Sequence, residues 1–232
     1  MAAPLARALT GALLCSLGAG GLAAQAFEGV VTWQMSEKNQ QMVQTYKGGM
    51  VRTEMGREGR QAVMIMDGAG KTMTMIMPSE KMYMTMDLSQ AGHQMPGMDH
   101  GPAKTPKITA TGKTETIAGR SCEVYRYAEE EGKPDKMEMC VAKGLGYFMM
   151  GGGGGPMGRR DPMADVTGAA ANPEYARLYK DGFFPLRVSR LEGGKAEQLM
   201  IVTKLEPKAV DASAFQVPAG YQEMKMPGMG RP

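Results

Sequence analysis

The sequence predicts a mainly β protein with few helices, in which about eleven strands form one antiparallel sheet that curls to bury one face. Short segments alternate apolar and polar residues at the two-residue period of a strand, and Gly- or Pro-containing turns separate them. A single segment, beginning at residue 172, has clear helix signals. Methionine occurs 25 times, whereas Phe, Tyr and Trp together make 6% of the chain, so thioethers are expected to fill much of the apolar space.

The strands are expected between short loops, and two Gly-Gly pairs at 48–49 and 193–194 favour tight hairpins. A helix is expected to start at Asn172-Pro173, run to about 180 and stop at Gly182. The predicted strands cover 27–35, 41–47, 50–55, 61–66, 71–77, 82–87, 108–117, 122–128, 136–142, 185–192 and 195–206.

The N-terminus has the pattern of a secretory signal peptide. Arg7 is the only charge in residues 1–26, an apolar run covers 8–17, and residues 24–26 read Ala-Gln-Ala, as at a signal-peptidase site. The apolar run is too short for a membrane span, which needs about 20 residues. We therefore expect cleavage before Phe27, export to the periplasm and no transmembrane anchor, the alternative being a buried N-terminal helix.

The remaining chain is long enough for one domain with a real core. We assign the domain to residues 27–223, with flexible insertions at 90–107 and 149–171 and a disordered tail at 224–232. The formal net charge of +3 is close to neutral and therefore indicates no nucleic-acid partner.

The sharpest pattern is an alternation of methionines between residues 64 and 86. If turns occupy 67–70 and 78–81, period-two alternation places all eight on one face of three neighbouring strands. These are Met64, Met66, Met73, Met75, Met77, Met82, Met84 and Met86. The opposite face holds Val63, Ile65, Ile76 and Tyr83 among threonines, and we expect it to be partly exposed to water.

Methionine is unbranched and polarisable, and it is common on surfaces that accept varied apolar ligands. A dedicated core would more naturally use Leu, Ile and Val. We therefore interpret the eight side chains as the lining of a deformable apolar cavity. The alternatives are an ordinary core and a role in metal handling.

Both histidines lie in one short segment, together with two methionines. His93, Met95, Met98 and His100 combine imidazoles with thioethers, and soft thioethers select Cu(I). The segment resembles the Met- and His-rich segments of periplasmic copper-handling proteins, and the tail after residue 223 has a similar composition. The alternative is an inert, solvated linker.

Two cysteines follow the signal segment, Cys122 and Cys140. In an oxidising compartment an isolated pair indicates a disulfide, and two free buried thiols are the alternative. With both histidines in the linker and both cysteines bonded, the sequence offers no nucleophile–base arrangement for catalysis. We therefore expect no enzymatic activity.

Three segments then resemble a known family. They are 116–125 leading to 139–141, the Phe-Pro-Leu-Arg-Val run at 184–188, and the Phe-Gln-Val-Pro-Ala-Gly-Tyr run at 215–221. Together they resemble an exported bacterial family, domain of unknown function DUF4412, in the lipoprotein-localisation superfamily typified by LolA and LolB. The resemblance implies a curled antiparallel half-barrel closed by helices, with a concave apolar side that holds acyl chains. It would put the methionine residues on that side.

The sequence therefore predicts a non-enzymatic periplasmic protein that holds an apolar or acyl-bearing ligand. It needs no cofactor in that role. One alternative is a Cu(I)-binding or copper-protective protein that uses the linker, and another is an envelope adaptor or stress sensor that binds a protein.

Overall fold

A computed structural model describes residues 27–36, 40–57, 60–88, 107–129, 131–146 and 182–224. The predicted signal peptide, the insertion at 149–171, the helix expected from residue 172 and the tail beyond residue 224 lie outside these residues. The linker expected at 90–107 does too, except for Lys107, which begins a strand.

Twelve strands form one sheet, and they include all eleven predicted strands. In chain order they are β1 (Gly29–Met35), β2 (Gln41–Lys47), β3 (Met50–Arg57), β4 (Arg60–Asp67), β5 (Thr72–Met77), β6 (Met82–Asp87), β7 (Lys107–Ile117), β8 (Arg120–Ala128), β9 (Met137–Ala142), β10 (Phe184–Glu192), β11 (Lys195–Pro207) and β12 (Gln222–Glu223). A 3-10 helix, η2 (Ala212–Phe215), precedes β12.

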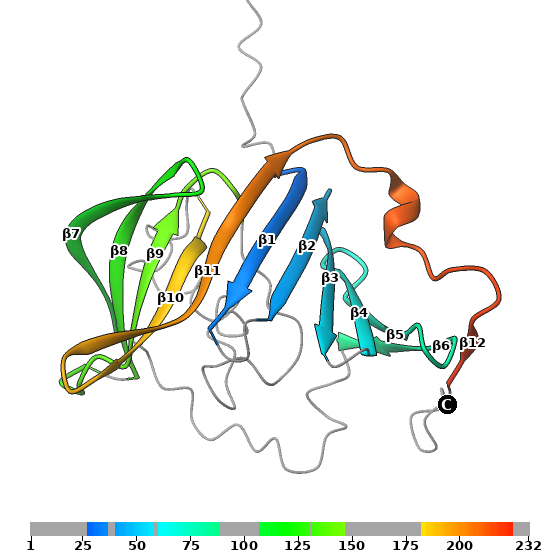
Figure 1. Cartoon of the computed structure of the whole chain (residues 1–232), viewed down its shortest axis with the longest axis horizontal. Coiled ribbons are helices and arrows are strands. Elements are labelled where there is room, and N and C mark those ends of the chain that lie inside the picture. The colour runs from blue at the N-terminus through cyan, green and yellow to red at the C-terminus, as the bar shows by residue number, and fades with distance from the viewer. Residues whose placement is uncertain are drawn as a thin grey trace, which may run out of the picture.

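The strand order across the sheet is β12-β6-β5-β4-β3-β2-β1-β11-β10-β9-β8-β7 (Figure 1). The strands β1 to β6 follow one another as antiparallel neighbours, and β1 pairs with β11 to join them to the second half of the chain. The predicted fold class is confirmed: the protein is an open, curled sheet consistent with a half-barrel.

Both predicted Gly-Gly hairpins are present. Gly48 and Gly49 have φ of 56° and 83°, and Gly193 and Gly194 have φ of 57° and 80°. A two-residue hairpin that follows the twist of its strands needs positive φ at both central residues, which glycine adopts without a Cβ clash.

Irregular pairing bends the sheet. The β1–β11 and β10–β11 pairings each skip one residue of β11, the β10–β9 pairing skips one residue of β10, and the β7–β8 pairing shifts between positions 110 and 114. Bulges of this kind increase the local twist and bend a strand. As a result Arg187 on β10 bonds both carboxylate oxygens of Glu115 on β7, at 2.7 and 3.2 Å, although β9 and β8 lie between these strands in the sheet.

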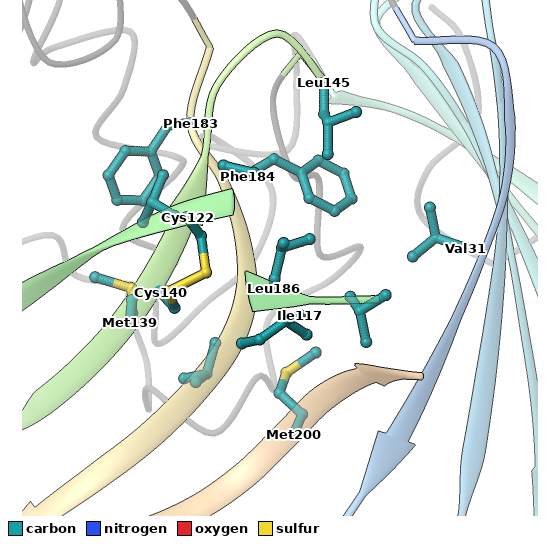
Figure 2. Close-up of a cluster of buried hydrophobic side chains, with 14 of the residues drawn as sticks. Val31, Ile117, Cys122, Met139, Cys140, Leu145, Phe183, Phe184, Leu186 and Met200 are labelled. Carbon is teal, nitrogen blue, oxygen red and sulfur yellow. A yellow bond between two sulfur atoms is a disulfide. The ribbon is translucent and has the colours of Figure 1, made fainter. Parts of the chain in front are cut away.

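The main core collects apolar side chains from β1 to β3 and from β7 to β11. Phe184 lies with its ring centroid 5.9 Å from that of Trp33 and 5.7 Å from that of Tyr46. The predicted disulfide between Cys122 and Cys140 is confirmed and is part of this cluster (Figure 2).

A second, smaller core lies on the other side of the sheet at β4 and β5. Val63, Ile65 and Ile76 are buried, and Phe215, Val217, Tyr83 and Tyr221 pack against them. The prediction that this face is partly exposed is therefore wrong for Val63, Ile65 and Ile76, because the chain after β11 covers them, whereas Tyr83 is partly exposed as expected.

We call residues 208–224 the C-terminal strap. Figure 1 shows it leaving β11 in orange and reaching β6 in red. Its start is held by Glu28, which accepts a hydrogen bond from the Val210 amide at 2.7 Å, and Arg52 donates to the Ala214 carbonyl at 3.1 Å. β12 then pairs with β6 in parallel, Gln222 opposite Met82 and Glu223 opposite Tyr83.

Candidate functional site

The eight predicted methionines share one face of β4, β5 and β6, and we call this surface the methionine face. They form three cross-strand rows, in which directly opposite residues are paired. The rows are Met66–Met73–Met86, Met64–Met75–Met84 and Met77–Met82. The predicted arrangement is confirmed, while the role of the face is a separate question.

One turn differs in detail from the prediction. The turn at 78–81 is where it was expected, since Met77 pairs with Met82. The first four-residue loop covers 68–71 instead of 67–70, because Asp67 pairs with Thr72. The Asp67 carboxylate accepts the amide hydrogens of Ala69 and Gly70 at 3.0 and 2.9 Å and so fixes the loop one residue later. The shift moves the pairing by two residues and leaves every side chain on its expected face.

The methionine face continues the inner side of the main core. Met66 packs against the main cluster and pairs with Val51, which pairs with Tyr46. In the next row Met64 pairs with Thr53, and Thr53 pairs with Gln44. Because the main cluster collects side chains from both halves of the sheet, it marks the side toward which the sheet curls. The methionine face therefore lies on the concave side.

Burial differs between the two faces of these strands. Met64 and Met73 are 8% and 7% exposed, and the other six methionines are only half-buried. On the opposite side, Ile76 is 1% exposed beneath the strap. The best-sealed core of β4 and β5 is therefore on the side away from the methionine face.

A buried polar network borders the methionine face. The side-chain oxygen of Gln44, a residue with 0% exposure, accepts hydrogen bonds from Trp33 Nε1 at 2.9 Å and from the Tyr46 hydroxyl at 2.7 Å. Gln44 Nε2 donates to the Thr53 hydroxyl at 3.3 Å. Burial raises the pKa of Tyr46 well above its usual value of 10.0, so the phenol stays a donor. These hydrogen bonds hold the side chains of Gln44 and Thr53 in place beside the methionine face.

Sequence reasoning did not single out this network. The available signal was register: once Met64 is placed inward, its partners Thr53 and Gln44 must also point inward. A glutamine at an inward position of a strand needs bonded partners, since a buried amide without them is costly.

Two hollows formed by described residues lie elsewhere. One, of about 880 Å³, is lined by β7, β8 and the loop before β9, and it adjoins a second of about 490 Å³. The first contains Lys107 and Arg126, which are paired with Glu131 at 2.8 Å and Glu138 at 3.3 Å. Much of its positive charge is thus already matched by carboxylates.

The candidate copper ligands His93, Met95, Met98 and His100 lie outside the described residues. Within the described ranges, no three His, Cys, Asp or Glu side chains gather as a metal site would require. In the same ranges, no helix is long and apolar enough to cross a membrane.

The fold and this face define a class, an open antiparallel sheet with an apolar concave side. Residues 27–221 match the family described as "Domain of unknown function (DUF4412)", so the chain belongs to this family. No curated protein matches the sequence.

Two solved structures are similar in arrangement. An uncharacterized conserved protein from Thermus thermophilus is 10% identical, with 87% of this chain and 91% of that chain covered and a TM-score of 0.46. A structure of PNGF-II is 11% identical, with 86% of this chain and 31% of that chain covered and a TM-score of 0.44.

Proposed function

We propose that the methionine face binds an apolar or acyl-bearing ligand, and that the protein is a non-enzymatic binding protein of the periplasm. One observation carries the proposal. Around β5 the sealed core lies beneath the strap, and the other side presents eight thioethers, six of them only half-buried.

An apolar surface left open to water is unfavourable unless something covers it. Removing apolar area from water contributes roughly 25 cal/mol per Å², and contiguous exposed apolar patches mark interaction sites. The opposite face shows what a sealed layer looks like in this sheet, with Ile76 beneath aromatic side chains of the strap. Among the residues that the structure describes, no such layer covers the half-buried methionines, which favours a ligand as their cover.

The size of the face favours a slender ligand. Three strands spaced about 4.8 Å apart give a width of roughly 10 Å, and the five residues from Met82 to Met86 give a length of roughly 14 Å. A stable protein–protein interface needs about 800 Å² on each partner, several times more than this footprint. An acyl chain or another narrow apolar group fits the face better than a folded partner does.

Placement in the LolA/LolB superfamily is part of this proposal, since that resemblance implies a concave sheet that holds acyl chains. Export follows from the signal-like residues 1–26. Flexible thioethers would let the face accept chains of different shape.

The test uses charge on the face. Met75→Lys and Met84→Glu change half-buried positions, and the new charge can reach water, so melting temperature should fall only moderately. Binding of a fluorescent fatty acid by the same samples should be lost. Met200→Lys is the matched control, because Met200 is 0% exposed and an unpaired charge there should unfold the protein.

The proposal fails if the wild-type protein binds no apolar probe. It also fails if the two face variants lose as much stability as Met200→Lys, which would make the methionine face an ordinary core. Mass spectrometry of lipid that copurifies with the native protein then identifies the ligand class.

A further inference from the structure

The central row of the methionine face brings three thioethers together from three adjacent strands. Met75 on β5 is directly opposite Met64 on β4 and directly opposite Met84 on β6. We propose that this row binds one soft monovalent metal ion of the Cu(I) type. The site shares the face with the proposed apolar ligand but does not depend on that ligand.

Sheet geometry lets the three sulfur atoms meet. Directly opposite residues have Cβ atoms about 4.5 to 5.5 Å apart, so Met75 has a methionine neighbour on each side. The side chain is unbranched with three rotatable bonds, and the two outer sulfurs can lean toward the middle one. The concave curvature inclines neighbouring side chains toward one another, so a three-sulfur site above Met75 needs only side-chain rotation.

The chemistry of the row selects the ion. Thioethers are soft, neutral ligands and prefer Cu(I) to harder divalent ions. A monovalent ion on neutral ligands leaves one positive charge in a half-buried apolar setting, whereas Zn²⁺ would leave two. Because burying uncompensated charge is costly, the row should discriminate strongly against divalent ions.

The other two rows are less suitable. Met66 packs against the main core, which restrains its thioether, and the Met77–Met82 row holds two sulfurs. In the central row Met64 is buried, while Met75 and Met84 are half-buried and open to an arriving ion. The flanking rows would supply apolar walls on both sides of the ion.

The test uses the full chain without the candidate linker ligands, which we call the linker-silenced protein. In every sample, His93 and His100 are replaced by Asn. Met95 and Met98 are replaced by Leu. Cu(I) affinity is then measured by competition with a chromophoric chelator under reducing conditions, with Zn²⁺ in parallel. We expect one Cu(I) to bind, and we expect no Zn²⁺ binding at matching concentration.

The matched variants are Met75→Leu and Met77→Leu. Leucine nearly conserves volume, so the fold should be retained in both. Met75→Leu should weaken Cu(I) binding by about tenfold or more, which corresponds to about 1.4 kcal/mol. Met77→Leu, in the two-sulfur row, should change it by less than about twofold.

The ion site is refuted if the linker-silenced protein binds no Cu(I), or if Met75→Leu and Met84→Leu leave its affinity unchanged. Loss of fatty-acid binding in the charged variants with no Cu(I) effect in the leucine variants would support the proposed function alone. The reverse result would support the ion site alone.

Discussion

Truncation of Ile76 to alanine tests whether the strap side of β5 is a true core. Ile76 is 1% exposed and lies in a cluster with Val63 and Ile65 under the strap. The change removes three carbon atoms, at about 0.8 kcal/mol each, and leaves a cavity that adds to this loss. Because the partly buried strap residues can move inward, we expect a total near the lower end of the usual range, about 3 kcal/mol.

Urea unfolding followed by fluorescence measures this loss directly. Trp33 is the only tryptophan and is fully buried, so its emission reports the folded state. The matched control is Met75→Ala, one residue away on the same strand but on the half-buried face, which should cost only about 1 kcal/mol. A loss below about 1 kcal/mol for Ile76→Ala, or equal losses for the two variants, would refute the assignment of core and ligand faces.

Three further outcomes are expected. Replacing Cys122 and Cys140 by serine should lower the free energy of unfolding by about 3 kcal/mol by the chain-entropy estimate, and thiol labelling of the unreduced wild type should find neither thiol free. Gln44→Met removes a buried acceptor and should cost about 2 kcal/mol or more; adding Tyr46→Phe should recover part of that loss in a double-mutant cycle. Burial is the main cause that raises the pKa of Tyr125 from 10.0 to about 12, and the neighbouring carboxylate of Glu123 adds to the rise. The unfolded chain therefore loses this proton first, so stability should fall as pH rises from 10 to about 12, and urea titrations of Tyr125→Phe should show a weaker fall.

Strand positions were predictable because the inward and outward residues alternate along most of the chain. Trp33 and Val31 on β1, for example, are fully buried while their neighbours are half-exposed. Paired glycines located two hairpins, and an even-numbered loop was enough to place all eight methionines on one face. The register of β4 against β5 was missed by two residues because it depends on the Asp67 cap, which is a side-chain interaction within the loop.

The strap was missed because short, irregular segments carry little periodic signal. β12 has two residues, and η2 has four. Apolar residues at Phe215, Val217 and Tyr221, after an Asp211 side chain that caps the turn, were the available hint. The alternation within single strands therefore could not predict that the strap covers Val63, Ile65 and Ile76. It also could not predict that Gln44 points inward, because that depends on its pairing with neighbouring strands. Bulges also escaped prediction, since alternation continues on either side of them.

The pairing of β1 with β11 has a consequence for how the chain folds. It joins Gly29 to Pro207, whereas β1 to β6 are linked in succession by local turns. The first six strands can therefore associate early, but one edge of β1 stays open until nearly the whole chain has emerged. Such long-range closure is slow, and an open edge strand is prone to pair with other molecules. The two halves of the sheet are therefore expected to fold as a single cooperative unit. A chain truncated before β11 should aggregate, because its first six strands do not form a stable fold by themselves.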